Sequence, residues 1–482
     1  MVGELHQSGL FLQQDYRKAI FLFTLSADQG HPMGQLNLGI NTGMQTNPEL
    51  GISLIQRAAD QDLLRARSYL AWCMYNGDGV PKDCETALKL LQEGIDREDN
   101  LARFYYGFIL STRNSESETP PEDQSRAIEL YTLAAAGGHL GANYHLALEY
   151  LIGRWVEPDP QKAKDLLHTA VYGGHSRAMF RLGVMYVDGE AGEKDESTGL
   201  DLIEEAANRG VGDACTRMGW YYSNGIETPL NPIRAMRYFI TAANQGDPTA
   251  QFELGRMREE GIGVDQDYAQ AASLYLLAAK QGYPRAQLSL GRLYATGKGV
   301  EKDEQMALDL YRAAADQDLD VAMHMLGAFY YRGGETIAKD IHQAIFYFQK
   351  AIAKGNLVFS ILNLAFIYLL GDTGVEMDEA KAAVLFKQAA DSGNDSGQFN
   401  LGVLYLEGRG VEQSDRMAAT LFSLAAMQGK HGSELNLGLM YKLGKGMPLD
   451  FAKAASWLTK ATNQGNERAG VYLAQLSSTT AD

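Results

Sequence analysis

Cysteine is scarce in this sequence. The 482-residue chain has three cysteines, Cys73, Cys84 and Cys215, and none of them belongs to a CxxC pair. A disulfide framework and a cysteine-based zinc site are therefore excluded as organising features. We expect the three thiols to be ordinary small core residues.

Long apolar runs are also absent. No stretch of about 18 apolar residues occurs, so the sequence predicts no membrane-spanning helix and no direct membrane insertion. The first residues lack a basic region followed by an apolar stretch, so no signal peptide is visible. These features favour the cytoplasm, although a periplasmic or secreted protein whose leader had been removed upstream of Met1 would show the same ones.

Basic residues are outnumbered by acidic ones. The chain has 43 Lys and Arg against 60 Asp and Glu, a formal net charge of −17. An anionic chain is repelled by nucleic acid and by anionic lipid, so we expect neither as a partner.

Catalytic motifs are missing as well. The sequence contains no GxSxG, HExxH or Ser-x-x-Lys. The glycines before Lys298 and Lys445 are spaced one residue too widely for a phosphate-binding loop. The sequence therefore predicts no enzyme, no cofactor and no metal site.

What the chain does have is an internal repeat, seen most clearly at 286–322. Ala286, Leu290 and Tyr294 are four residues apart and predict one apolar helix face. Gly297 and Gly299 then predict a turn. Asp303 follows as a candidate cap of a second helix, whose apolar face begins at Ala307.

The unit recurs along the chain, mostly every 36 residues. Its opening small residue stands at Gly34, Ala66, Ala102, Ala142, Ala178, Ala214, Ala250, Ala286, Ala322, Ser360, Gly397, Ser433 and Ala469. A polar insertion covers 111–123. A Gly or Ala comes five residues after each opening, which predicts a close approach between neighbouring helices, because mid-helix glycine costs about 1 kcal/mol.

The ends of the second helices carry their own signals. Their expected N-caps include Asp15, Asn47, Asp83, Asp123, Asp159, Asn231, Asp303 and Ser414. Pro48, Pro160 and Pro232 are expected at the first helical position. Glycines such as Gly282 and Gly429 are expected to end these helices with positive φ.

The two chain ends differ from the other units. The segment 1–33 aligns with a truncated first repeat, so either the natural protein extends upstream or the chain has been trimmed. Residues 469–477 read as a terminal capping helix, and 478–482 as a frayed tail.

The pattern A-x3-LG-x2-Y-x2-G-x-GV-x2-D-x3-A-x6-AA-x2-G resembles the Sel-one-like repeat (SLR) family, relatives of the tetratricopeptide repeats. Matches at 286–318 and 397–429 are close, and the resemblance covers essentially 1–482 as a single domain. It implies an all-α, right-handed superhelical solenoid of about thirteen helix-turn-helix repeats plus the capping helix. It also implies first helices that line a concave face, and an adaptor that binds other proteins.

The fourth, seventh and eleventh residues of each unit, counted from its opening small residue, are expected to line that face. The fourth and seventh residues fall into three zones. The aromatic zone contains Tyr69, Trp72, Tyr105 and Phe108, followed by His145. The basic zone contains Arg181, Arg217, Arg256 and Arg292, with Trp220 among them. The amide zone contains Asn363, Asn400 and Asn436.

Each zone has a structural alternative. The aromatic residues could be core, the arginines could pair with Asp188, Glu253 and Glu260, and the asparagines could cap contacts between helices. As binding residues, the arginines would bind carboxylates or phosphates. The asparagines would bind the backbone of an extended peptide.

The sequence therefore predicts a non-enzymatic scaffold that binds a segment of another protein, in part acidic, in its groove. Two alternatives stay open. One is a regulator or immunity-type inhibitor that wraps a target protein. The other is an enzyme or small-ligand binder that uses the region of His145 and Arg181. His139, His145, His168 and His175 fall in two adjacent units but at unlike positions, which does not favour a zinc site.

Overall fold

The computed structural model describes residues 16–43, 47–113, 120–355 and 357–479. These residues form helices joined by turns, with an isolated bridge between Asp372 and Val375 and no strand. The all-α class and the repeated helix pair predicted from the sequence are confirmed. The chain divides into two units, 1–246 and 247–482, and each unit is described by itself.

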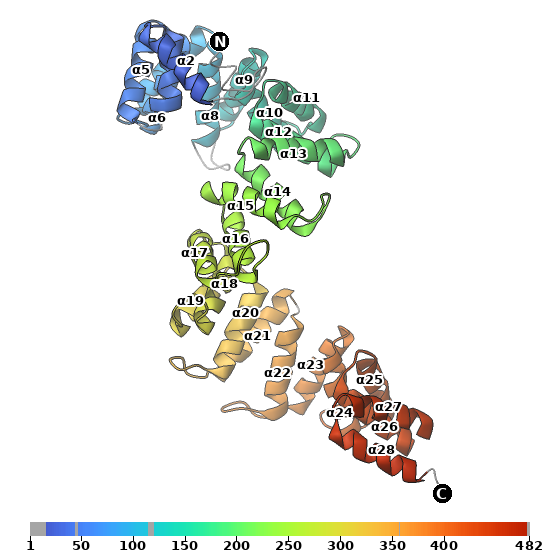
Figure 1. Ribbon diagram of the computed structural model, residues 1–482. Coiled ribbons are helices and arrows are strands. Elements are labelled where there is room, and N and C mark those ends of the chain that lie inside the picture. The colour runs from blue at the N-terminus through green and yellow to red at the C-terminus, as the bar shows by residue number, and fades with distance from the viewer. Residues whose placement is uncertain (1–15, 44–46, 114–119, 356, 480–482) are drawn as a thin grey trace. The chain divides into compact units, whose positions relative to one another are not determined.

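In the first unit, first and second helices alternate along the chain (Figure 1). The first helices are α3 (Pro32–Leu38, continued by the π-helical η1, Gly39–Gly43), α6 (Leu64–Asn76), α8 (Asn100–Thr112), α10 (Leu140–Ile152), α12 (Ser176–Asp188) and α14 (Gly212–Asn224). The second helices are α2 (Tyr16–Asp28), α5 (Pro48–Asp60), α7 (Cys84–Asp96), α9 (Pro121–Ala136), α11 (Pro160–Tyr172), α13 (Glu196–Asn208) and α15 (Pro232–Asn244).

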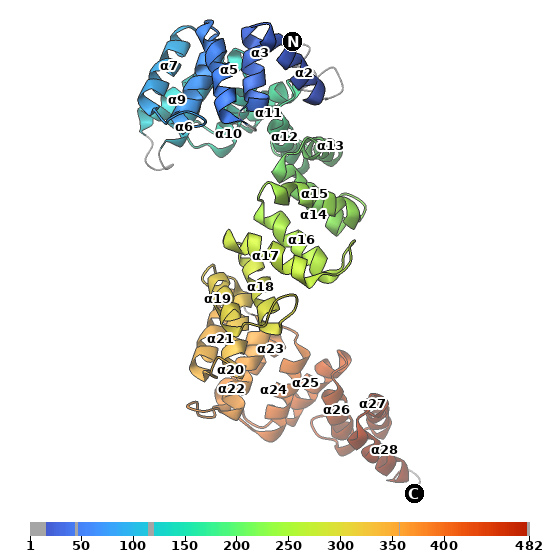
Figure 2. The ribbon, with the colours of Figure 1, turned by 60° about the vertical axis from the view of Figure 1, so that its left-hand side comes forward.

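The second unit repeats the arrangement, which Figure 2 shows from another side. Its first helices are α16 (Pro248–Glu260), α18 (Pro284–Thr296), α20 (Asp320–Arg332), α22 (Val358–Leu370), α24 (Asp395–Glu407), α26 (His431–Leu443) and α28 (Glu467–Thr479). Its second helices are α17 (Tyr268–Lys280), α19 (Glu304–Ala315), α21 (Ile341–Gly355), α23 (Glu379–Asp391), α25 (Asp415–Met427) and α27 (Phe451–Asn463). The segment 469–477 lies within α28, whereas 480–482 of the tail and 1–15 of the first repeat fall outside the described residues.

The second helices begin where the sequence predicts, because their caps form. The Asp303 carboxylate accepts a hydrogen bond from the Met306 amide at 2.9 Å. The same bond to the third following residue is made by Asn47, Asp83, Asp159, Asn231 and Ser414. The predicted cap at Asp123 is wrong. Helix α9 begins two residues earlier, at Pro121, whose preset φ and missing N–H suit the first helical position, and Asp123 lies in the first turn. Asp15 lies outside the described residues.

The close approach predicted at the mid-helix glycines is confirmed. A Cβ on Gly255 would lie 2.6 Å from the ring of Tyr275, and one on Gly291 would lie 2.8 Å from the ring of Tyr311. In these pairs the first helix therefore rests its glycine on a large side chain of the second. These large side chains form the centre of the core and are almost completely buried, at Tyr131, Phe239, Tyr275, Tyr311, Phe348, Phe386 and Phe422.

Candidate functional site

The aromatic zone is a packed array of rings from α6, α8 and α10. The ring of Trp72 stacks on Tyr105 with centroids 4.9 Å apart. Phe108 and Trp72 meet edge to face, with centroids 5.6 Å apart. Tyr69 meets Tyr105 edge to face at 6.3 Å. These rings are half-buried against one another, so the array joins neighbouring first helices while leaving part of each ring accessible.

His145 extends this array into the next repeat. Its ring lies 5.3 Å from Phe108 and 5.2 Å from Tyr144. Burial lowers the pKa of His145 to about 4, helped by the positive charge of nearby Arg177. The imidazole is therefore neutral near pH 7.

The other histidines of this region have separate tasks. The Nδ1 atoms of His139 and His175 accept hydrogen bonds from the amides of Ala142 and Ala178, both at 3.1 Å, so these histidines cap α10 and α12. The Nε2 atom of His168 lies 3.1 Å from the Tyr186 hydroxyl. Within the described residues, no three His, Cys, Asp or Glu side chains converge as metal ligands would.

In the first unit, the arginines of the basic zone contact carboxylates of neighbouring turns. Arg181 donates to Glu190 at 2.6 Å. Arg217 lies 3.6 Å from Asp188, and its Nε donates to the Tyr221 hydroxyl at 3.1 Å. Trp220, one residue before that tyrosine, is 45% exposed. Trp220 is thus the most accessible indole beside a zone arginine.

The second unit contains the other two arginines. Arg256 lies between Glu253 and Glu260, 3.0 Å from each. Arg292 donates to Glu259 of the preceding repeat at 2.6 Å, although the Arg292 side chain is 54% exposed. The pairing partners that the sequence left open are Asp188, Glu253 and Glu260, whereas Glu190 and Glu259 are further partners.

The amide zone is less tightly held. Asn400 donates to the Ser396 carbonyl of its own helix at 2.7 Å. Asn363 and Asn436 are half-buried, and their side-chain amides make no hydrogen bond to a described residue. Among the described residues, no hydrogen bond or ion pair joins His145 to Arg181. His145 contacts the ring of Phe108, and Arg181 pairs with Glu190.

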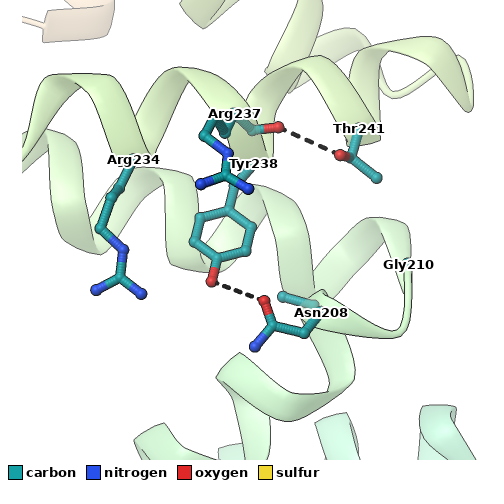
Figure 3. Close-up of a pocket in the computed structure, with 7 residues that line it drawn as sticks. Asn208, Gly210, Arg234, Arg237, Tyr238 and Thr241 are labelled. Carbon is teal, nitrogen blue, oxygen red and sulfur yellow. Dashed lines mark hydrogen bonds between the residues drawn. The ribbon is translucent and has the colours of Figure 1, made fainter. Parts of the chain in front are cut away.

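A pocket of about 240 Å³ lies between α13 and α15, on second helices rather than first ones. Figure 3 shows Arg234 and Arg237 projecting from α15 beside Tyr238, whose hydroxyl donates to the side-chain Oδ1 atom of Asn208 at 3.1 Å. The Arg234 guanidinium is held by Glu204 at 2.7 Å. Sequence reasoning missed this pocket because it considered only first-helix positions.

A larger pocket of about 480 Å³ lies on the first-helix side of the second unit. It includes Arg292 of the basic zone together with residues that the sequence analysis did not single out, among them Ala295, Tyr311, Ala328 and Arg332. We refer to it as the Tyr311 pocket. The sequence signal that could have revealed this pocket is Ala328. It stands at the seventh position of its unit, where the two preceding units have Arg256 and Arg292.

None of the described helices combines the length and apolar composition needed to cross a bilayer. Among curated proteins, chitin synthase regulatory factor 3 of Schizosaccharomyces pombe is 30% identical over 175 residues, which is 33% of this chain. The match spans 18% of that relative, less than a fifth of its length.

Solved structures and a family model also match. The structure of c5321, a protective antigen present in uropathogenic Escherichia coli strains and displaying an SLR fold, is 27% identical with a TM-score of 0.75; the match covers 89% of this chain and 90% of that one. A Sel1 repeat protein from Oxalobacter formigenes is 26% identical with a TM-score of 0.44, over 51% of this chain and 96% of that one.

The family model for the Sel1 repeat matches in consecutive copies along almost the whole sequence. They cover residues 1–31, 32–63, 64–99, 101–139, 141–175, 176–211, 212–247, 248–283, 284–319, 320–356, 358–394, 395–430 and 432–466. These copies follow the helix pairs of the structure. On this evidence the chain belongs to the Sel1 repeat family.

Proposed function

We propose that this protein is a non-enzymatic scaffold that binds an acidic segment of a partner protein along its first helices. The observation that supports this most is the exposed Trp220 beside Arg217, on a helix face where arginines recur from repeat to repeat. Sel1 repeat proteins generally mediate protein–protein interactions and are generally not enzymes. The net charge of −17 argues against nucleic acid as the partner.

The existing ion pairs are compatible with this role. Arg217 and Asp188 are 36% and 45% exposed. Solvent-exposed pairs of this kind contribute only about 0.2–1 kcal/mol to stability. A partner carboxylate that approaches Arg217 in a desolvated interface can therefore replace Asp188 at little cost, and the adjacent indole offers a large rigid contact area.

The same binding face also suits a regulator that wraps its target. Such a regulator binds its partner as a scaffold does and differs only in what binding does to the partner's activity. The similarity to part of a chitin synthase regulatory factor favours this variant. The small-ligand alternative at His145 is less favoured, since aromatic rings of α8 and α10 surround its imidazole.

Affinity capture from the native extract tests the proposal. The wild-type chain is compared with a double variant, Arg217→Gln with Trp220→Ala, and the captured proteins are identified by mass spectrometry. A matched control, Arg126→Gln with Tyr172→Ala, removes one guanidinium and one exposed aromatic ring from the second helices α9 and α11.

We expect a partner that is captured by the wild type and by the control but lost with the double variant. Both variants should keep the helical circular-dichroism signal and melt within a few degrees of the wild type. Equal capture by all three chains would contradict binding at this face. Turnover of a small molecule by the purified chain would contradict the non-enzymatic assignment.

A further inference from the structure

The repeat formed by α16 and α17 contains a carboxylate held by a buried tyrosine and an arginine. The hydroxyl of Tyr275 on α17 donates to Glu259 on α16 at 2.8 Å. Arg292, on the first helix of the following repeat, donates to the other oxygen of Glu259 at 2.6 Å. Glu259 thus satisfies two donors at once, one from each side of a repeat junction.

The next repeat keeps the tyrosine and loses its partners. Tyr311 follows Tyr275 by 36 residues, but the residue 36 after Glu259 is Ala295 and the residue 36 after Arg292 is Ala328. Ser289, which also interacts with the Tyr275 hydroxyl, is likewise replaced by Met325. The loss of long polar side chains on both sides leaves the volume of about 480 Å³ that forms the Tyr311 pocket.

Tyr311 is left with an unsatisfied hydroxyl. Its side chain is 1% exposed, and the hydroxyl has no hydrogen-bond partner among the described residues. By contrast, Tyr131 occupies the same position of an earlier repeat and lies 2.9 Å from the Ser111 hydroxyl. A buried polar group without a partner is unfavourable, so the Tyr311 hydroxyl favours any acceptor that can enter the pocket.

The charges around the pocket favour an anionic acceptor. The two acidic lining residues are already engaged, because Glu304 accepts from the Thr336 amide at 2.9 Å and Glu335 pairs with Lys302 at 2.8 Å. Arg332, at the end of α20, has no ion-pair partner among the described residues. The charges of Arg292 and Arg332 both act on the Tyr311 hydroxyl, whose pKa burial raises to about 12.

We propose that the Tyr311 pocket binds a carboxylate of an acidic side chain on the partner segment, in the place that Glu259 fills one repeat earlier. The Tyr311 hydroxyl and the Arg332 guanidinium donate to it, and Arg292 adds positive charge at the rim. This inference rests on the proposed scaffold function and assigns one binding position within it.

Binding of a fluorescein-labelled hexaglutamate peptide to the full chain, followed by fluorescence anisotropy, tests the pocket. Three variants change it in different ways: Arg332→Gln removes the free charge, Tyr311→Phe removes the donor, and Ala295→Glu supplies an internal carboxylate at the position equivalent to Glu259. The matched control is Arg285→Gln, an exposed arginine on α18 that does not line the pocket.

We expect Arg332→Gln, Ala295→Glu and Tyr311→Phe each to weaken hexaglutamate binding about tenfold or more, which is the loss expected when a hydrogen bond to a charged group is removed. Arg285→Gln should change it less than twofold, and hexaglutamine should not bind. Ala295→Glu should also melt at the wild-type temperature or above it, because the internal carboxylate accepts from Tyr311. If Ala295→Glu fails to fold, the Arg332→Gln variant still tests the pocket, because Arg332 is exposed and its replacement should leave folding unchanged.

The carboxylate in the pocket can belong to a partner side chain or to a free dicarboxylate, and competition by glutarate distinguishes these two sources. Displacement only at a large excess over the peptide supports a partner side chain, whereas equal potency per carboxylate supports a free dicarboxylate in the same pocket. Equal peptide binding by all variants would overturn the inference. A natural partner captured equally by the wild type and by Ala295→Glu would overturn it while leaving the scaffold proposal intact, whereas the absence of any partner would contradict the scaffold itself.

Discussion

Three residues other than glycine follow second helices in a backbone conformation that the repeat otherwise gives to glycine at that position. Second helices are followed by residues with positive φ, among them Gly138 and Gly282. Asp62, Glu98 and Asp318 take the same conformation with φ between 60° and 70°. Asp62 and Asp318 gain ion pairs there, with Arg97 at 2.9 Å and Lys354 at 2.6 Å, whereas Glu98 gains none among the described residues.

Glu98→Gly should therefore stabilise the first unit. The left-handed conformation costs an L-residue about 1–2 kcal/mol, and glycine avoids this cost while losing part of the gain to its flexible unfolded state. We expect the free energy of unfolding to rise by about 0.5–1 kcal/mol, measured by urea unfolding. Glu98→Ala removes the same charge but keeps a Cβ, so a similar gain in that control would show that charge, not backbone strain, is the cause.

At the scale of helices, each pair is held by the contact between a small residue and a large one. Gly255 of α16 lies against Tyr275 of α17, and Gly402 of α24 lies against Phe422 of α25, where an added Cβ would be 2.9 Å from the ring. Because the neighbour is a buried ring rather than the end of a flexible chain, the helices themselves must separate to admit a methyl group.

Gly255→Ala should accordingly destabilise the protein although alanine is the better helix former. Overpacking of a core costs about 1–3 kcal/mol, which exceeds the roughly 1 kcal/mol gained in helix propensity. We expect a lower urea midpoint and unchanged helical content. Gly470→Ala on α28 is the matched control, since its Cβ would be 3.4 Å from the nearest atom, and it should be neutral or stabilising. A gain of stability in Gly255→Ala would refute the packing role of this glycine.

The features predicted correctly from the sequence are those that local signals encode. A cap such as Asp303 and a crossing glycine such as Gly255 act on residues three or four positions away or recur at a fixed spacing, so the pattern alone reveals them. Asp123 was misplaced because the pair Pro120 and Pro121 starts the helix earlier than the acidic residue does.

Other contacts could not be predicted because they join helices in space. The buried Gln287 on α18 accepts a hydrogen bond from Gln317, 30 residues later, at 3.0 Å, and Gln398 accepts one from Gln428 at 2.9 Å. The pair recurs between Gln251 and Gln281, but a glutamine repeated on each helix does not by itself show that the two side chains face each other. The Tyr311 pocket escaped notice for the same reason, since it depends on replacements in two different first helices.

At the scale of the whole molecule, the buried histidines make the stability of the fold depend on pH in the acid range. Burial lowers the pKa of His139 and His145 to about 4, and it also lowers the pKa of His175 and His324. The unfolded chain binds protons to His139 and His145 below about pH 6.5, whereas the folded chain binds protons to these two residues only near pH 4. Between these values the unfolded state holds more protons, so the stability of the fold falls as the pH falls.

His145→Phe should remove part of this acid sensitivity. Phenylalanine keeps a ring among Phe108 and Tyr144 but cannot be protonated. Each unit of pKa depression corresponds to about 1.4 kcal/mol, so the variant should lose roughly 2 kcal/mol less than the wild type between pH 7 and pH 4.5. Urea unfolding at pH 7, 5.5 and 4.5 measures the difference, and His342→Asn at an exposed position provides the control. If all three chains lose stability with the same slope, the buried imidazole at 145 is not the group that links proton binding to unfolding, and the acid response belongs to the carboxylates.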